Sequence, residues 1–401
     1  MTTILLSLLN SPMKKILFYC QYLAGMGHLV RSTEIVRSLV PDFQVSLVIG
    51  GEPIDQFEVP DGVEVVYLPA LREDAGKLMA LNQSVESVKI ARRQRLLALF
   101  EQFQPDCVIT ECFPFSKYKM AFELLPLLER AKATQVKVVC SLRDLIMTQS
   151  MSEKGLARKQ ARILDQIRQF YDLVLCHSDR NLQSLDACFP SAHALTCEVF
   201  YTGYVAQSLV TSSVQQQDLK SPRIVASVGG GRYGYSLLKA IGEVGPLLRQ
   251  AIPHQIYAFA GPFMPESEFD SLQTLTSSQP NITLQRFTPN LMDYLEGADL
   301  SISLGGYNTT MNVLSTQVRS LILPSPSPDQ ADEQWLRASR LAQLGAVDVL
   351  SPDQLSPSAL AHAILQHLHT AKPSHAINLK GSENTAKRLR QLCNQTVALA
   401  R

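Results

Sequence analysis

The sequence predicts an α/β protein with two doubly wound, parallel-sheet domains, and three observations lead to this fold class. Short β-branched apolar runs alternate with longer amphipathic stretches from Met13 onward, which is the pattern of parallel strands joined by crossover helices. The alternation stops in a Ser- and Gln-rich segment over 205–221 and restarts after Pro222. The 401 residues also exceed the size, about 250–300 residues, at which a single hydrophobic core stops growing.

The first domain, over 13–204, is predicted from six apolar runs and four amphipathic stretches. The predicted strands are Lys15–Cys20, Gln44–Ile49, Val63–Leu68, Cys107–Thr110, Lys137–Ser141 and Leu173–His177. The predicted helices are His28–Leu39, Val85–Phe103, Phe122–Lys132 and Glu153–Phe170.

The second domain, over 222–375, repeats the pattern after the linker. The predicted strands are Arg223–Val228, Gln255–Phe259, a short one near Thr283–Phe287, Leu300–Leu304 and Ser320–Leu323. Helices are expected up to Leu248, from Thr309, near Glu333–Leu344 and over Pro357–His369. A C-terminal helix follows over 376–401, and one arrangement packs it back toward the first domain. Ligands of such sheets bind at the carboxyl ends of the strands, so we expect the two domains to face one another across a binding cleft.

Composition excludes several classes of protein. The formal net charge of +1, with 18% charged residues, lacks the basic excess of nucleic-acid binders. Eight cysteines without a two-residue spacing are interpreted as buried thiols in a reducing cytoplasm. The apolar first ten residues are interpreted as a disordered extension or an upstream start, with a signal peptide as the alternative. We therefore expect a soluble, cytoplasmic protein, in which Phe113–Phe115 offers at most a peripheral membrane contact.

The first candidate site follows the first predicted strand, where Gly25 and Gly27 flank a turn that opens into a helix. Glycines permit the tight turn, and the helix start offers free N–H groups to an anion or a sugar hydroxyl. His28 can serve there as a general base because its ordinary pKa lies near neutrality, and Arg31 lies one turn further along. A capping or packed histidine is the structural alternative.

Acidic residues follow two later strands of the first domain. Glu111 follows the strand Cys107–Thr110, at the sheet edge where His28 is expected, so its carboxylate is a candidate partner for the imidazole. Asp144, preceded by Arg143, is the competing candidate. Either acid could also serve only as a helix cap.

The second domain contains two glycine turns between a strand and a helix. Gly229, Gly230 and Gly231 form the first, and Gly305 and Gly306 the second. Two helix starts on one sheet edge could hold a diphosphate without a metal ion, since backbone dipoles supply positive potential.

Several motifs resemble those of predicted glycosyltransferases related to the bacterial peptidoglycan N-acetylglucosaminyltransferase. The motifs are GMGHLVRS at Gly25–Ser32, PDCVITECFPF at Pro105–Phe115, SLRD at Ser141–Asp144, SVGGG at Ser227–Gly231, GPFMP at Gly261–Pro265 and SLGGYNTTMNVLS at Ser303–Ser315. The resemblance implies a GT-B fold and a metal-independent, inverting transfer from a nucleotide-sugar, with a UDP-sugar as the expected donor. It also implies that the N-terminal domain holds the acceptor, which stays unidentified, and that no cofactor is needed.

The resemblance also implies roles for individual residues. His28 is similar to the histidine near the acceptor, and Gly229–Gly231 to the loop that faces the cleft. The remaining donor contacts implied are Phe287 and Thr288 for the base, Gly306, Asn308 and Thr309 for the diphosphate, and Glu333 and Gln334 for the sugar. Relatives usually carry a ribose-binding glutamate where this chain has Asn312, and a neutral amide binds a hydroxyl more weakly than a carboxylate does.

Two other functions compete with sugar transfer. The pattern Gly-x-Gly-His-x-x-Arg over Gly25–Arg31 also resembles that of nucleotide-sugar hydrolases, in which water replaces the acceptor. A catalytically silent nucleotide-sugar binder is the third possibility; Asn312 favours it, whereas the intact His28 favours an enzyme.

Overall fold

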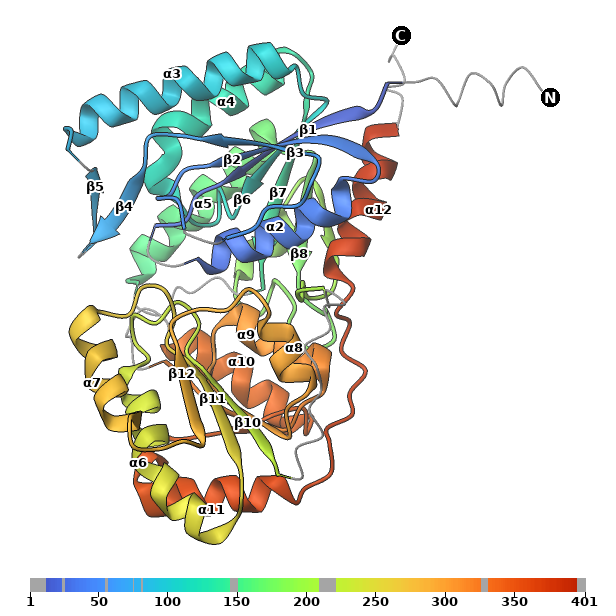
Figure 1. Ribbon diagram of the computed structural model, residues 1–401. Helices are drawn as coiled ribbons and strands as arrows, with labels where there is room; N and C mark the ends of the chain where they lie inside the picture. Colours follow the sequence, from blue (N-terminus) through green and yellow to red (C-terminus); the bar gives the residue numbers. More distant parts are fainter. Residues whose placement is uncertain are drawn as a thin grey trace, which may run out of the picture. The chain divides into compact units, whose positions relative to one another are not determined.

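The computed structural model describes residues 12–23, 26–54, 57–74, 76–80, 82–144, 151–208, 221–325 and 331–394. The chain divides into two compact units (Figure 1). The first contains Arg31–Val205, the preceding strand and the C-terminal segment from Lys380; the second contains Ala206–Leu379. The division passes through one helix, whose first turn up to Val30 is grouped with the second unit. The predicted N-terminal extension and most of the predicted linker lie outside the described residues.

The first unit is a seven-stranded parallel sheet with strand order β3-β2-β1-β6-β7-β8-β9. Its strands are β1 (Lys14–Cys20), β2 (Phe43–Ile49), β3 (Val63–Tyr67), β6 (Cys107–Glu111), β7 (Lys137–Arg143), β8 (Leu173–His177) and β9 (Glu198–Tyr201). Its α-helices are α2 (Gly27–Leu39), α3 (Val85–Phe103), α4 (Ala121–Ala133), α5 (Glu153–Phe170) and α12 (Gly381–Asn394). An antiparallel hairpin, β4 (Leu71–Asp74) and β5 (Lys77–Ala80), follows β3.

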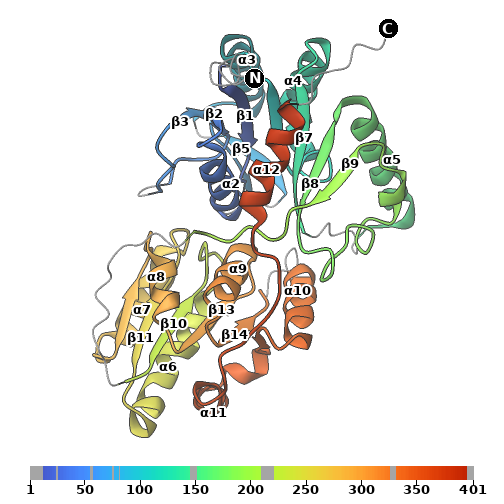
Figure 2. The same cartoon turned by 90° about the vertical axis from the view of Figure 1, so that its right-hand side faces the viewer.

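Both faces of this sheet are buried. Leu17, Val108 and Cys140 pack into one cluster with residues of α3, α4 and α5. Because side chains alternate along a strand, the neighbouring Phe18 and Ile109 point to the opposite face, where they are equally buried. Figure 2 shows α12 alongside the strands of this unit. Continuous apolar strands of this kind are typical of a sheet covered on both sides.

A buried ion pair joins the two helices α3 and α4. Arg92 donates from Nε to Glu123 Oε2 at 2.8 Å and from Nη2 to Glu123 Oε1 at 2.6 Å, and both side chains are fully buried. The third guanidinium nitrogen, Nη1, donates to the carbonyl oxygens of Gly50 and Pro69, each at 2.8 Å. Paired and fully bonded, these charges fix the position of α3 relative to the sheet.

The second unit is a six-stranded parallel sheet with strand order β12-β11-β10-β13-β14-β15. Its strands are β10 (Arg223–Ser227), β11 (Gln255–Phe259), β12 (Ile282–Gln285), β13 (Leu300–Leu304), β14 (Ser320–Leu323) and β15 (Asp348–Val349). Its α-helices are α6 (Tyr235–Ala251), α7 (Glu266–Thr276), α8 (Leu291–Glu296), α9 (Tyr307–Thr316), α10 (Ala331–Gln343) and α11 (Pro357–Leu368).

The α/β fold class with two parallel sheets is confirmed, and the strands Leu173–His177, Gln255–Phe259, Leu300–Leu304 and Ser320–Leu323 have the predicted bounds. The sequence prediction lacked β4, β5, β9, β15, α7 and α8. Strand β15 is two residues long, the other three strands are four and α8 is six, so the hydrophobic periodicity of these elements is weak.

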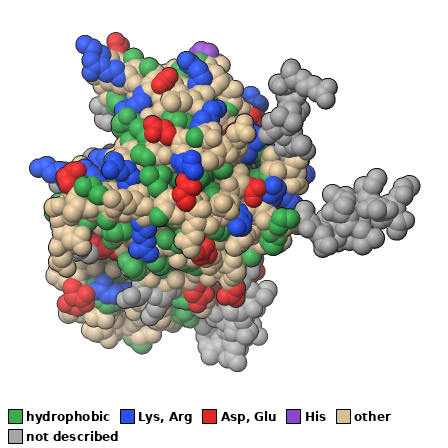
Figure 3. Space-filling model, turned by 90° about the horizontal axis from the view of Figure 1, so that it is seen from above, with side chains coloured by type: hydrophobic (Ala, Val, Ile, Leu, Met, Phe, Trp, Pro, Cys, Tyr) green, Lys and Arg blue, Asp and Glu red, His purple; other side chains and the backbone are tan. Residues whose placement is uncertain are grey.

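Two further observations concern possible membrane-spanning helices and the distribution of surface charge. Within the part of the chain that the structure describes, no helix is both long and apolar enough to span a membrane. Acidic and basic side chains are interspersed on the face seen in Figure 3.

Candidate functional site

The carboxyl ends of β6, β7 and β8 bring polar residues of the first unit to one sheet edge. Glu111 ends β6 and lies opposite Ser141 of β7, and Arg143 ends β7 opposite His177 of β8. Apart from Arg143 these side chains are buried. Buried polar groups need partners, so their contacts define the site.

Glu111 forms a buried ion pair with Arg31 of α2. The same guanidinium lies 3.7 Å from the Cys112 sulfur, whose thiol donates to Glu111 Oε1 at 3.0 Å. Burial, and then the charge of Glu111, raise the pKa of Cys112 to about 11, so this thiol stays protonated at neutral pH. Cys112 also has a positive φ of 60°, a backbone conformation that non-glycine residues adopt rarely.

His28 lies one turn before Arg31, so α2 fixes its position relative to this pair. Among the described residues, the ligand atoms of His28, Glu111 and Cys112 lie within 4.8 Å of one another. The structure therefore brings the two predicted catalytic residues, His28 and Glu111, into one cluster. Arg31 and the protonated thiol make this donor set a better site for proton transfer than for a cation.

A chain of buried hydrogen bonds continues from this cluster to β8. The Cys112 amide donates to the Ser141 carbonyl at 2.9 Å, and Ser141 Oγ lies 2.8 Å from His177 Nε2. His177 Nδ1 lies 2.9 Å from Thr202 Oγ1, and that hydroxyl donates to the Gly203 carbonyl at 2.7 Å. Because Thr202 donates onward, it accepts from Nδ1, and Nε2 is left to accept from Ser141.

His177 stays neutral in this chain. Burial, and then the charge of Arg31, lower the pKa of His177 to about 3. Sequence reasoning missed this residue, although its place at the end of a predicted strand was a usable signal. It also missed Ser141, Cys112 and Thr202, whose residue types carry no signal on their own.

The other residues predicted on the acceptor side are placed as follows. Asp144 is buried, and its Oδ1 lies 3.9 Å from Arg143 Nε, so the competing acid is also beside a guanidinium. Gly27 is the exposed first residue of α2. Gly25 lies outside the described residues.

In the second unit, the first glycine turn interlocks with the loop after β11. Gly231 has φ +94°, and a Cβ there would lie 2.2 Å from the Ala260 carbonyl oxygen. Gly261 has φ +82°, and a Cβ there would lie 2.4 Å from the Gly229 carbonyl oxygen. Phe263 N donates to the Gly230 carbonyl at 2.9 Å. Only glycine fits at Gly231 and Gly261, and the two loops hold each other in place.

The second glycine turn lies beside the first. Strands β10 and β13 are neighbours, and Gly306 is the N-cap of α9. A Cβ at Gly229 would lie 3.8 Å from Thr309 Oγ1, in the first turn of α9. Asn308, next to Thr309, is partly exposed. The backbone N–H groups that begin α9 therefore lie next to the Gly229–Gly231 loop, an arrangement suited to an anion.

The predicted sugar contacts lie on α10, and they support the second glycine turn. Arg337 pairs with Glu333 at 2.5 Å and donates to the Gly305 carbonyl at 3.2 Å. Gln334 Oε1 accepts from the Ser325 amide at 2.9 Å. Both predicted residues are buried, so α10 braces this turn by its side chains.

Asn312 has a defined partner in the second unit. Its Nδ2 donates to Gln207 Oε1 at 2.6 Å, and its Oδ1 accepts from Gln207 N at 3.2 Å. The side chain is buried, so the amide holds the chain just after Ala206 against α9.

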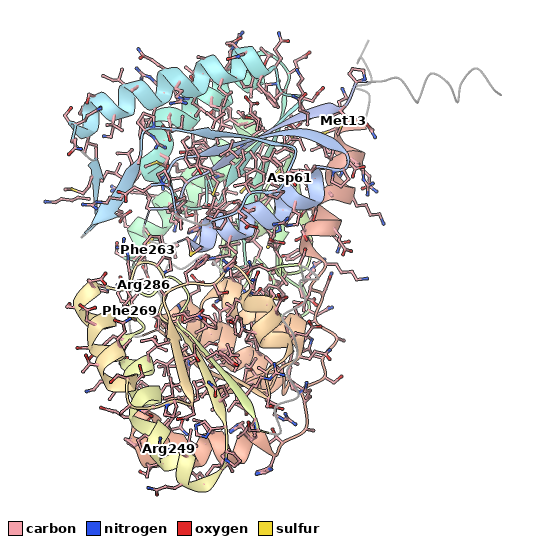
Figure 4. The ribbon with its side chains drawn as sticks, in the orientation of Figure 1. Met13, Asp61, Arg249, Phe263, Phe269 and Arg286 are labelled. Atoms are coloured by element: carbon pink, nitrogen blue, oxygen red, sulfur yellow. The ribbon has the colours of Figure 1, made fainter. Side chains whose placement is uncertain are left out.

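The predicted base contacts Phe287 and Thr288 follow β12 and are partly exposed. Thr288 Oγ1 accepts from Asn290 N at 3.1 Å, which forms a local turn. The Arg286 guanidinium lies 4.1 Å from the Phe269 ring centroid, a cation–π distance (Figure 4).

Parts of the chain are similar in sequence to known glycosyltransferases. The glycosyltransferase family 28 C-terminal domain matches residues 225–392. A UDP-N-acetylglucosamine–N-acetylmuramyl-(pentapeptide) pyrophosphoryl-undecaprenol N-acetylglucosamine transferase of Oenococcus oeni is 28% identical over 124 residues, 31% of this chain and 32% of that protein. An uncharacterized glycosyltransferase of Methanosarcina acetivorans is 22% identical over 282 residues, 68% of this chain and 65% of that protein. The match thus spans about a third of the first relative and less than two thirds of the second.

Among solved structures, MurG of Acinetobacter baumannii superposes with a TM-score of 0.54 at 15% identity, covering 96% of this chain and all of that one. The two parallel Rossmann-like sheets therefore define a protein of the GT-B fold. Residues 225–392, less than half of the chain, match the glycosyltransferase family 28 C-terminal domain, and part of the chain is similar to bacterial peptidoglycan N-acetylglucosaminyltransferases.

Proposed function

We propose that this chain is a glycosyltransferase that moves a sugar from a nucleotide-sugar, most simply a UDP-sugar, to an acceptor held by the first unit. The observation that carries the proposal is the pair of glycine turns at the carboxyl ends of β10 and β13, within the segment that matches the family 28 domain. Parallel sheets of this type bind their ligands at that edge.

In the proposed reaction, His28 takes the proton of the acceptor hydroxyl as that oxygen attacks the anomeric carbon. The bond from the anomeric carbon to the diphosphate breaks, and the nucleoside diphosphate leaves. Attack opposite the leaving group inverts the configuration. Glu111, held by Arg31, lies within 4.8 Å of the His28 ring nitrogen and is the carboxylate proposed to orient the imidazole.

The second unit supplies the donor side of the proposed reaction. The N–H groups at the start of α9, beside the Gly229–Gly231 loop, stabilise the charge that develops on the departing diphosphate. Phe287 and Thr288 contact the base, and Glu333 and Gln334 contact the sugar. In this proposal the backbone dipoles supply the positive potential that a metal ion supplies in other transferases, and the reaction uses no resident cofactor.

Hydrolysis of the nucleotide-sugar is the second candidate function, because His28 and Arg31 on one helix turn also fit activation of water. The same base would then act on water in place of the acceptor hydroxyl.

The test is a calorimetric titration of UDP, GDP, dTDP and CMP with their common sugars, followed by an acceptor-free turnover assay. Binding with little acceptor-free turnover is the result expected for a transferase. Rapid release of free sugar would show a hydrolase instead. Binding without turnover in the presence of any acceptor would indicate a silent binder, and no binding would overturn the proposal.

A further inference from the structure

The C-terminal helix α12 crosses the first unit from one end of the sheet to the other. Near its start, Asn384 Nδ2 donates to the Thr202 carbonyl at 2.8 Å, just beyond the carboxyl end of β9. One turn later, Arg388 donates from Nε to Glu198 at 3.1 Å, where β9 begins. Arg390 then lies 3.3 Å from Asp42, just before β2 begins. The last turn of α12 therefore lies at the amino ends of the strands.

Cys393 belongs to the face of α12 that packs onto the sheet. Ala386 and Leu389 are buried, and Cys393 follows them at the three- and four-residue spacing that keeps side chains on one helix face. The cysteine itself is only partly buried, because it occupies the last turn.

Cys107 opens β6, the central strand of the sheet, at the same end. Val108 packs into the cluster of α3, α4 and α5, so strand alternation directs Cys107 to the opposite face. Its thiol is fully buried. Strand register and helix periodicity thus bring Cys107 and Cys393 together, 286 positions apart in the sequence.

The chemistry of the pair agrees with this placement. A hydrogen bond with the Cys107 thiol lowers the pKa of Cys393, while burial and the charge of Asp106 oppose this shift and the nearby Lys14 and Lys137 support it. The same hydrogen bond raises the pKa of Cys107, as does its burial. Cys393 is the more accessible of the two thiols, and the fully buried Cys107 is positioned to react second.

We propose that Cys107 and Cys393 form an oxidative modification site, at which a small-molecule disulfide such as oxidised glutathione converts the two thiols into a disulfide. The Cys393 thiolate attacks one sulfur of the oxidant and releases one glutathione thiolate. Cys107 loses its proton, attacks the Cys393 sulfur of the mixed disulfide and releases the second glutathione. Two electrons pass to the oxidant, and the protein loses two hydrogens.

The cross-link attaches α12 covalently to the centre of the first sheet. Closing a loop of this length restricts the unfolded chain, and the helix that follows the second unit is then fixed to the first unit by more than side-chain contacts. The remaining cysteines of the described chain are free thiols as well, and Cys197 offers a matched control in the same unit with similar partial burial.

The experiment incubates the full chain with oxidised glutathione under native conditions and analyses it by intact mass and by peptide mapping without reduction. We expect a loss of two hydrogens, a peptide that joins Cys107 to Cys393, and a rise in Tm of at least about 3 °C. Cys393→Ser and Cys107→Ser are expected to abolish the cross-linked peptide, and Cys197→Ser to leave it unchanged.

Three results would overturn the proposal. One is a glutathione adduct that stays on Cys393 without forming the cross-link. Another is a disulfide that joins other cysteines, and the third is a cross-link that persists in Cys393→Ser. The Cys393→Ser variant keeps the size of the side chain, so its thermal unfolding without oxidant verifies that loss of the cross-link does not come from loss of the fold.

Discussion

The two units carry their candidate sites at equivalent sheet edges but build them from different parts of the chain. In the first unit the edge consists of buried side chains, with Arg31 paired to Glu111 and His177 in a hydrogen-bonded chain. In the second unit the edge is mainly backbone, with Gly231 and Gly261 at positive φ and the start of α9 beside them. The first edge should therefore respond to charge and pH, whereas the second should respond to a Cβ added where two backbone segments approach closely, as at Gly231 and Gly261.

The largest effect is expected from Arg31→Met. Removing the guanidinium leaves the Glu111 carboxylate buried without its ion-pair partner, which should cost about 3–5 kcal/mol of unfolding free energy. Chemical denaturation measures it. Arg130→Met is the matched control, because Arg130 and Glu101 form an exposed pair, and little change is expected there. Equal losses in both variants would contradict the role assigned to burial.

Gly231→Ala should have the next largest effect. The new Cβ would overlap the Ala260 carbonyl oxygen at a positive φ, and we expect a loss of about 2–4 kcal/mol together with weakened nucleotide binding. Gly306→Ala is the control, since nothing lies within 4 Å of a Cβ there, and its stability should stay within about 0.5 kcal/mol. Thermal unfolding and calorimetric titration distinguish the two variants.

The buried His177 should make the unfolding free energy of the first unit depend on pH. Its pKa falls from 6.5 to about 3 in the folded protein, so below pH 6.5 the unfolded chain binds a proton that the folded chain does not. The resulting stability is complete above pH 6.5 and is lost as the pH falls toward 3, by up to about 1.4 kcal/mol per pH unit. His177→Gln should remove this part of the slope. The exposed His193→Gln should retain it, and an unchanged slope in His177→Gln would refute the assignment.

The smallest effect concerns Asn312, which the sequence interpretation placed at the donor ribose. A glutamate at this position would bind a ribose hydroxyl more strongly than the amide does, but in the structure both polar atoms of the Asn312 side chain are hydrogen-bonded to Gln207. We therefore expect Asn312→Glu to tighten nucleotide binding by a factor of about three only when Gln207→Ala is also present. A calorimetric titration of both variants tests this, and an equal gain in Asn312→Glu alone would show that Gln207 does not compete.

The sequence predicted the sheets well because parallel strands are buried on both sides and appear as continuous apolar runs, as Leu173–His177 does. It placed His28 and Glu111 at one edge because the carboxyl ends of parallel strands share that edge. It did not reveal the pairing of Glu111 with Arg31, since which two charges meet depends on packing between α2 and β6.

Contacts between segments that are far apart in the sequence could not be predicted from the sequence either. The Ser141–His177–Thr202 chain joins three segments, and the meeting of Cys107 with Cys393 depends on the return of α12 to the first unit. Neither is encoded in a local motif. In the second unit the glycine turns were visible from their residues, because positive φ and close approach of the backbone leave glycine as the residue that fits.

The most direct test of the proposed function is the rate at which His28→Ala releases nucleoside diphosphate from the nucleotide-sugar that binds most tightly. The affinity of the variant for the same donor is measured in parallel. Loss of the base should lower turnover by about 10²–10⁴-fold while donor binding changes little, because His28 acts on the acceptor or on water. The exposed His193→Ala should behave as the unaltered protein. Unchanged turnover in His28→Ala would contradict the account.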